Sequence, residues 1–504
     1  MEEPIISDEA AIPTVMSVDE VIESSLGKMR WTQIIQAILA CIPPVFDNQQ
    51  TLISAFSDVH PTWRCTGTNT RSCNSSTDIC TLPRTDWDWT GNKHSTVISD
   101  WDLECASSFV KGLPATCFFL GCLLTGFMVA SLGDSSLGRK KLLVISCLTM
   151  SLAALALGFS PNFWCYCVIR FICGAGRVSV TISSCVLLSE KVGKKWRGQF
   201  VLFGFISLTV GLVSLTGIAF ATRNLSWRAL YFWTSVPGII YSVLIHLFQF
   251  ESPRWLFLRG RQSEALTVLK KIGCIDHLGL LLAQKMLKIE QGHSVNSNTN
   301  PFSSIKILVD KKWAIRRLIV TMVFTFGVGM MYFGMLLGVG GLGLNIYLSS
   351  IFNSFVSLFS SLLTYLFWIQ RFNRRSSVLA FCIVSGATSM LSIAARQHHK
   401  GVNVGLELIA LFCACMVYNI SFMYTVELFP TCVRNTAASL TRQAMIFSSM
   451  FVPVLVVIGR RNVKFCPTVF GVSIIVCGLL VMTLPEIRGK VMCDTMEEQE
   501  VTAN

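Results

Sequence analysis

The sequence predicts an all-α membrane protein with twelve transmembrane helices arranged as two pseudo-symmetric six-helix halves. Of its 504 residues, 52% are hydrophobic and only 14% are charged, whereas a soluble domain carries roughly 25% charged residues. Apolar blocks of ~20 residues, the length that crosses a bilayer as a helix, follow one another along the chain. One long polar segment, Glu251–Ile315, separates six blocks from six, which indicates two repeated halves around a midplane site.

Each apolar block is a predicted span. The spans are Trp31–Ser54, Lys111–Ser131, Lys141–Ser160, Phe163–Leu188, Gln199–Ala221, Arg228–Phe250, Arg316–Val339, Asn345–Trp368, Arg375–Ala395, Val402–Tyr424, Ala437–Gly459 and Phe465–Pro485. The first span contains two prolines and four polar residues: Pro43, Pro44, Asp47, Asn48, Gln49 and Gln50. Polar groups at that depth are tolerated only against protein or a water-filled cavity, so we expect the first helix to line a pathway.

The polar segments divide the chain into five parts. These are a cytosolic tail at 1–30, an N-terminal half at 31–250 with a large non-cytosolic loop at 55–110, a cytosolic central loop at 251–315, a C-terminal half at 316–485 and a cytosolic tail at 486–504. This orientation follows from the Lys and Arg residues that gather in the short loops after the second, fourth and eighth spans. The same loops explain the net charge of +13 without a nucleic-acid partner. The polar, acidic N-terminus predicts no cleavable signal peptide.

Four of the 20 cysteines lie in the non-cytosolic loop: Cys65, Cys73, Cys80 and Cys105. In an oxidising compartment they would form two disulfides, for which three pairings are possible. A zinc site is the alternative, but the spacing lacks the paired CxxC pattern. The same loop contains a glycosylation acceptor, Asn74, within an Asn-Ser-Ser triplet.

Several motifs follow one another in a recognisable order. At Gly133–Lys141 an acidic residue and a basic cluster share one cytosolic hairpin. Asp134 can cap the next helix or pair with a neighbouring arginine, and the basic cluster can contact phospholipid. The later motifs are Arg170–Gly176, Glu190 with Lys195–Gly198, Glu251–Leu256, and Glu427–Thr431 with Arg434. Together they resemble the signatures of the major facilitator superfamily, which implies the major facilitator fold. Sugar porters share several of these motifs.

Two features narrow the resemblance to one branch of that superfamily. Ser95–Cys105, at the end of a long Cys-bearing loop, resembles the organic cation, anion and carnitine branch, whereas sugar porters usually have a shorter loop there. The strings Val45–Thr51, Asp134–Arg139 and Cys432–Asn435 are most similar to plant organic cation/carnitine transporters. The resemblance spans residues 19–495. It implies a carrier in which a small organic cation or zwitterion, carnitine-like or choline-like, binds between the halves and crosses by alternating access. It leaves coupling to protons open.

Ionisable residues inside a bilayer are costly and are therefore functional candidates. They are Asp47, Arg170, Glu407 and Arg442, with Gln50 as a polar neighbour in the first span. Asp47 and Glu407 could neutralise an amine or carry a coupling proton. Arg442 could hold the carboxylate of a zwitterion, or only neutralise Asp47 or Glu407 as a structural pair. In the wider family the charged substrate-contacting position falls about one turn later, where this chain has Ile446.

Two further groups of side chains complete the predicted machinery. Tyr332, Phe333 and Tyr365 could enclose an ammonium by cation–π attraction, although packing within the bundle is the alternative. Charged residues at the cytosolic helix ends are expected to form a conformational latch: Asp134, Arg139, Glu190, Arg197, Arg254, Glu427 and Arg434. The second-half counterpart of the Asp134 hairpin, Gln370–Arg375, keeps the basic residues but lacks the acid. We therefore expect a salt-bridge latch only in the N-terminal half.

The sequence leaves two alternative functions open, a sugar porter and a membrane sensor. A proton-linked sugar porter would take up labelled hexose, and a membrane sensor would keep the fold without transport. No HExxH, GxSxG, P-loop or paired-Asp constellation is present, so we expect neither an enzyme nor ATP use, and no cofactor or metal. The Glu2–Ile6 stretch is a candidate sorting signal, and the vacuolar membrane is favoured over the plasma membrane.

Overall fold

The first span is a broken helix. The computed structural model of the chain describes residues 26, 30–66, 79–132, 138–273, 301–338, 345–368, 371–395, 400–462, 464–487, 496–497 and 500. The first span consists of α2 (Trp31–Cys41), α3 (Pro43–Leu52) and α4 (Ser54–Ser57). Prolines have no backbone N–H, so the helical hydrogen-bond ladder is interrupted at Ile42 and a new helix begins with Pro43.

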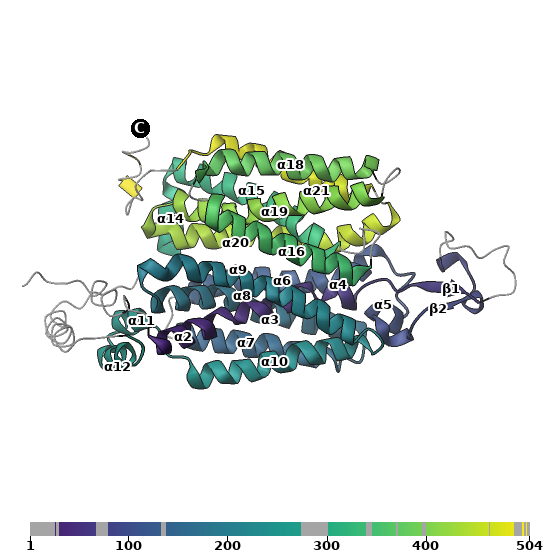
Figure 1. Ribbon diagram of the computed structural model, residues 1–504, viewed down its shortest axis with the longest axis horizontal. Coiled ribbons are helices and arrows are strands. Elements are labelled where there is room, and N and C mark those ends of the chain that lie inside the picture. The colour runs from purple at the N-terminus through teal and green to yellow at the C-terminus, as the bar shows by residue number, and fades with distance from the viewer. Residues whose placement is uncertain are drawn as a thin grey trace, which may run out of the picture.

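Five continuous helices complete the N-terminal half. They are α6 (Ser108–Leu132), α7 (Arg139–Leu157), α8 (Phe163–Lys191), α9 (Lys194–Ala221) and α10 (Trp227–Phe248). The short helices α11 (Pro253–Leu258), α12 (Gln262–Ile272) and α14 (Pro301–Asp310) follow. All three lie at one end of the bundle, which we call the α12 end (Figure 1).

The C-terminal half packs against the N-terminal half as a second layer (Figure 1). Its helices are α15 (Lys312–Leu337), α16 (Ile346–Leu363) continued by a π-helical turn (Thr364–Trp368), α18 (Arg374–Ala395), α19 (Lys400–Leu428), α20 (Thr431–Arg461) and α21 (Phe465–Leu479) with a final 3-10 turn (Leu480–Thr483). Within the described residues, eleven helices are long and apolar enough to cross a membrane. Together with the broken first span they confirm the predicted twelve-helix all-α membrane fold.

The two halves meet along two pairs of helices, α6 with α20 and α9 with α16. Small residues let the first pair approach closely, since a Cβ added at Gly112 would lie 2.9 Å from the backbone of Val454. Thr116 Oγ1 donates to the carbonyl oxygen of Met450 at 3.1 Å across the same pair. In the second pair the hydroxyls of Thr216 and Ser350 lie 2.7 Å apart. These polar contacts accompany apolar packing across the same boundary, where Phe119 of α6 meets Phe333 of α15.

The end opposite α12 carries a small β-hairpin, and we call it the hairpin end (Figure 1). Strands β1 (Trp63–Cys65) and β2 (Trp87–Trp89) pair antiparallel. The Arg84 guanidinium lies 3.8 Å from the ring centroid of Trp87, an arrangement that favours cation–π attraction. This hairpin precedes η3 (Lys93–Ser95) and α5 (Val97–Asp100), which lead into α6.

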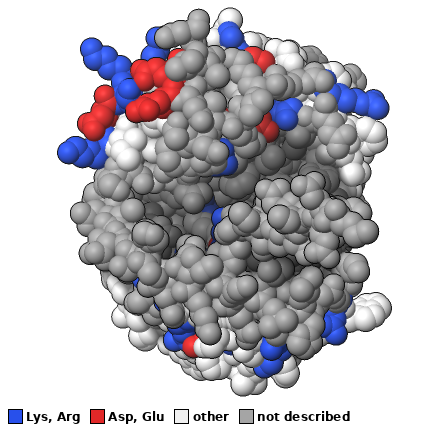
Figure 2. All heavy atoms as spheres, turned by 90° about the vertical axis from the view of Figure 1, so that its left-hand side faces the viewer, with Lys and Arg blue, Asp and Glu red and all other residues white. Residues whose placement is uncertain are grey.

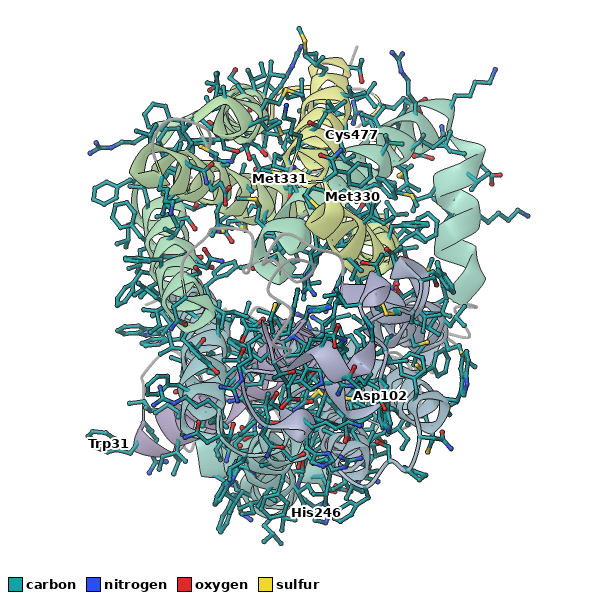
Figure 3. The ribbon with its side chains drawn as sticks, turned by 90° about the vertical axis from the view of Figure 1, so that its right-hand side faces the viewer. Trp31, Asp102, His246, Met330, Met331 and Cys477 are labelled. Carbon is teal, nitrogen blue, oxygen red and sulfur yellow. A yellow bond between two sulfur atoms is a disulfide. The ribbon has the colours of Figure 1, made fainter. Side chains whose placement is uncertain are left out.

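The outer surface of the bundle is apolar, as a lipid-facing surface requires. Trp31 and His246 point outward from the N-terminal half (Figure 3), and Trp31 is 80% exposed. Met330 and Met331, by contrast, are buried within the C-terminal half. Most polar side chains of α3 are also buried, namely those of Asp47, Gln49, Gln50 and Thr51, so they face protein and not lipid.

Candidate functional site

Asp47 on α3 is the centre of a buried charged cluster. Its side chain is 1% exposed, and its two carboxylate oxygens accept hydrogen bonds from Arg177 and Thr181 of α8. The Arg177 guanidinium also lies 5.8 Å from the ring centroid of Phe118 on α6. A carboxylate at this depth is tolerated because it is both ion-paired and hydrogen-bonded. We call Asp47, Arg177 and Thr181, together with Arg442, Tyr332 and Tyr418, the Asp47 cluster.

The neighbours of Asp47 fix α3 within the N-terminal half. The side-chain amides of Asn48 and Gln49 donate to α9, at 2.6 and 2.8 Å. Gln50 donates to Thr234 of α10 at 3.3 Å. The predicted site residue Gln50 therefore connects the first span to the sixth, and these bonds hold the Asp47 carboxylate in a fixed position.

The C-terminal half contributes an aromatic pair and a cation to the Asp47 cluster. Tyr332 of α15 and Tyr418 of α19 are stacked, with ring centroids 4.5 Å apart and planes at 11°. Tyr418 lies within electrostatic range of Asp47, Arg177 and Arg442. Arg442 of α20 is half-buried and has no hydrogen-bond or ion-pair partner among the described residues. The cluster thus combines one carboxylate, two guanidinium groups and two stacked rings drawn from both halves.

The α12 end of the molecule is hollowed between the two halves (Figure 2). Lys or Arg atoms are visible inside the hollow. Alternating access needs an opening at one end, because a ligand must approach a midplane site from one side at a time.

The other predicted aromatic residues lie apart from the stacked pair. Phe333 is buried and packs against Phe119 of α6, with ring centroids 5.5 Å apart. It therefore helps to join the two halves. Tyr365 lies in the π-helical turn at the end of the eighth span, whereas Tyr332 lies in α15.

Arg170 belongs to a second buried cluster of the N-terminal half. It is fully buried and donates to the carbonyl oxygen of Gln50, at 3.3 Å, and to the hydroxyl of Ser54. Its guanidinium lies 5.0 Å from the ring centroid of Phe118. These contacts connect the fourth span to the first. Arg170 and Asp47 are thus both buried, but they bind different partners.

Glu407 lies in a separate cavity at the hairpin end. The cavity has a volume of about 360 Å³, and its lining includes Glu407, His60, Asn353 and Arg460. No member of the Asp47 cluster is among its lining residues. The structure therefore divides the predicted ionisable candidates among three places: Asp47 with Arg442, Arg170 alone, and Glu407.

The predicted latch of the N-terminal half involves charges from three loops at the α12 end. Glu190, at the end of α8, interacts with Ser252 and lies within electrostatic range of Arg139 and Arg254. Glu251 accepts a hydrogen bond from the backbone N–H of Lys140 at 2.9 Å. Asp134 and the side chain of Arg197 lie outside the described residues.

The C-terminal half contains an ion pair at the same end, so our expectation of a salt bridge in the N-terminal half alone is wrong. Arg374 forms an ion pair with Glu427 at 3.2 Å. The carboxylate of Glu486 accepts the backbone N–H groups of Arg374 and Arg375, at 3.0 and 3.1 Å. The second half lacks a counterpart of Asp134 in its hairpin. Its basic residues are instead bound by Glu427 and Glu486, at the ends of the tenth and twelfth spans. Arg434 donates to the carbonyl oxygen of Phe429 at 3.3 Å.

Four important residues escaped the sequence analysis: Arg177, Thr181, Tyr418 and Glu486. Arg177 lies seven residues after Arg170, and Thr181 four residues later, so all three share one helix face. That spacing is the signal that would have identified them. Glu486 follows the last span of its half, as Glu251 follows the last span of the first half.

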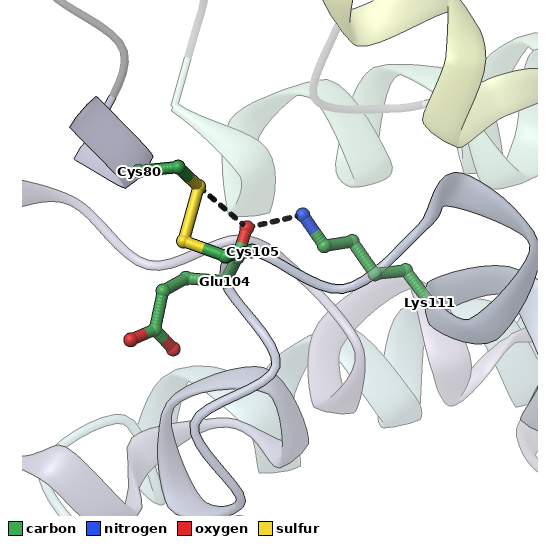
Figure 4. The surroundings of a disulfide bond; sticks show 4 residues. All are labelled: Cys80, Glu104, Cys105 and Lys111. Carbon is green, nitrogen blue, oxygen red and sulfur yellow. Dashed lines mark hydrogen bonds between the residues drawn. A yellow bond between two sulfur atoms is a disulfide. The ribbon is translucent and has the colours of Figure 1, made fainter.

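A disulfide closes the loop at the hairpin end. Cys80 is bonded to Cys105, with Cα atoms 5.6 Å apart, and Lys111 donates to the carbonyl oxygen of the neighbouring Glu104 (Figure 4). Cys65 is also disulfide-bonded. Cys73 and Asn74 lie outside the described residues.

The same loop is tied to the sixth span through Asp100. Its carboxylate accepts hydrogen bonds from Arg228 at 2.5 Å, from the Trp227 indole at 3.1 Å, and from His94. Burial acts to raise the pKa of Asp100, but these hydrogen bonds outweigh it and hold the pKa below its ordinary value. Asp100 therefore stays ionised and keeps the loop against the helices.

Comparison with known proteins places these features in a family. The family described as Sugar (and other) transporter matches residues 52–499. Organic cation/carnitine transporter 2 of Arabidopsis thaliana is 43% identical over 99% of this chain and 96% of its own length. Organic cation/carnitine transporter 3 of the same plant is also 43% identical, over 99% of this chain and 97% of its own.

More distant matches agree with this placement. Solute carrier family 22 member 13 of Homo sapiens is 26% identical over 82% of this chain and 73% of its own. A partially occluded inward-open structure of the xylose transporter XylE from E. coli superposes with a TM-score of 0.66, at 15% identity, and covers 92% of this chain and 100% of that chain. That likeness shows the major facilitator fold. The chain belongs to the Sugar (and other) transporter family and, within it, to the group of the organic cation/carnitine transporters.

Proposed function

We propose that this chain carries small organic cations or zwitterions, of the carnitine and choline class, across a membrane by alternating access. The observation that carries the proposal is the Asp47 cluster, in which a buried carboxylate from one half faces an aromatic pair and a cation from the other. Relatives at 43% identity are organic cation/carnitine transporters. Carnitine itself combines a quaternary ammonium with a carboxylate.

The cluster has a complementary group for each part of such a substrate. The carboxylate of Asp47 attracts an ammonium, and the stacked rings of Tyr332 and Tyr418 add cation–π attraction. Arg442 offers charge-assisted hydrogen bonds to a substrate carboxylate. A bound zwitterion would add one charge of each sign: its ammonium would share Asp47 with Arg177, and its carboxylate would give Arg442 a counter-charge.

The same ion pair gives a route for proton coupling. Protonation of Asp47 would remove its charge and release Arg177, which would weaken the hold of the cluster on an ammonium. We infer that the α12 end faces the cytosol together with both termini, because the basic loops lie there. We place the carrier in the vacuolar membrane. As the two halves rock against each other, the two latches would break and form again.

Uptake into proteoliposomes tests the proposal. Labelled carnitine, choline and tetraethylammonium are offered to vesicles with and without an inward proton gradient. We expect saturable uptake of at least one compound, blocked by excess unlabelled compound and abolished in Asp47→Asn. Glu264→Gln is the matched control, because it neutralises an exposed carboxylate on α12. If folded, inserted protein takes up none of them but takes up hexose, the chain is a sugar porter.

A further inference from the structure

The cavity at the hairpin end is separate from the Asp47 cluster. Its polar lining comes from five elements: Asn353 of α16, Ser389 of α18, Glu407 of α19, Arg460 of α20, and His60 after α4. All but His60 belong to the C-terminal half. A volume of about 360 Å³ falls in the range of small-molecule sites, roughly 300–1,000 Å³.

Asn353 is the observation that points to a ligand. Its side chain is only 3% exposed, yet it lines the cavity. Among the described residues it has no hydrogen-bond partner. Its amide oxygen and nitrogen are open to the cavity and not sealed in the core, so a bound molecule can satisfy them. The cavity therefore presents an unsatisfied donor and acceptor, and two charged residues, Glu407 and Arg460, line it as well.

The charges of the cavity are of opposite sign. Glu407 supplies a carboxylate and Arg460 a guanidinium, while Met335, Val456 and Phe470 supply apolar surface. Burial lowers the pKa of His60, which favours the uncharged imidazole. One anionic group, one cationic group and an apolar wall are complementary to a small zwitterion with a short alkyl chain.

We propose that this cavity is a second binding site for a small zwitterion, whose ammonium contacts Glu407 and whose carboxylate contacts Arg460, with Asn353 hydrogen-bonded to the ligand. The choice of carnitine as the zwitterion rests on the proposed function. The site itself rests on the cavity, its two charges and the amide of Asn353.

The site also depends on the conformation of the carrier. Val59 and His60 come from the N-terminal half and complete the cavity wall. The wall is therefore whole only while the two halves touch at the hairpin end. A ligand that binds one conformer better shifts the population toward it, so an occupied cavity keeps the hairpin end closed.

Equilibrium binding to the full chain in lipid nanodiscs tests the inference. The background is the double variant D47N/R177Q, which removes the Asp47 carboxylate and its Arg177 partner together, so that neither is left buried without the other. We expect labelled carnitine to bind at two sites per chain in the wild type and at one in this background. Adding Glu407→Gln or Asn353→Ala to the background should weaken the remaining site about tenfold or more. Adding Glu264→Gln should not.

The outcomes separate the two proposals. The second site would be overturned if carnitine still bound the D47N/R177Q background and neither Glu407→Gln nor Asn353→Ala weakened that binding. It would also be overturned if the wild type bound carnitine at one site only, or not at all. Choline and butyrate, each with one of the two charges, should bind the background about tenfold more weakly than carnitine, and equal binding would refute the zwitterion assignment. Uptake is measured separately in proteoliposomes. Absent uptake with Glu407-dependent binding intact refutes the proposed transport alone.

Discussion

Neutralising Asp47 is the sharpest test of the charged cluster. The variant Asp47→Asn keeps the size of the side chain and one hydrogen-bond acceptor for Thr181, but it removes the negative charge that faces Arg177. Asp47 is 1% exposed and Arg177 is 12% exposed, so solvent does little to compensate the orphaned guanidinium.

The magnitude follows from the burial of the pair. Removing one partner of a buried ion pair destabilises a protein by about 3–5 kcal/mol, because the other charge stays buried alone. Replacing both partners by neutral groups of similar shape is often neutral or stabilising. We therefore expect Asp47→Asn to unfold at a lower temperature than wild type, and the double variant D47N/R177Q to recover most of that loss. Substrate affinity should fall about tenfold or more in both, since a charge-assisted hydrogen bond contributes roughly 1.5–3 kcal/mol.

Two measurements on the same purified samples separate a structural role of Asp47 from a role in substrate binding. Tryptophan fluorescence follows thermal unfolding, and proteoliposome uptake follows transport at equal protein abundance. Stability that recovers in D47N/R177Q while uptake stays low would show that the pair has both a structural and a substrate role. Normal uptake of every tested substrate by D47N/R177Q would refute the assignment of Asp47 to the site.

Three further predictions concern the two ends of the bundle. Cys105→Ser should lower the free energy of unfolding by about 3 kcal/mol, because it opens a loop of 25 residues; an unchanged melting temperature under non-reducing conditions would contradict this. Asp100→Asn should speed proteolysis of the loop, because it removes the ion pair with Arg228. In the wild type the loop should stay docked as the pH falls and be released only below the ordinary Asp pKa of 3.8. The reason is that a carboxyl group with a lowered pKa stabilises the fold until the carboxylate is protonated. Arg374→Gln should break the ion pair with Glu427 and slow uptake several-fold while substrate binding is unchanged; an equal loss of binding would place this pair in the substrate site instead.

The sequence alone determined the number of spans, which is a local property. A run of about 20 apolar residues is long enough to cross the membrane as a helix whatever lies beside it. The same local reasoning identified Asp47 as a buried carboxylate, because its place in an apolar run is visible in the chain. The break in the first span appeared only in the structure, because Pro114, Pro237 and Pro453 lie inside helices that continue past them.

Only the tertiary structure decided which charges meet. Asp47 and Arg177 are 130 residues apart, and Arg374 and Glu427 are 53 apart, so neither pair is visible in a window of sequence. The position of an ion-pair partner depends on how the helices pack and rotate against one another. The hydrophobicity of a span does not determine either. For that reason our expectation of a salt bridge in the N-terminal half alone was wrong. For the same reason the sequence did not show that Glu407 lies in a separate cavity. Hydrophobicity along the chain fixes what enters the membrane, whereas ion pairing is set by distances of a few ångströms across helices.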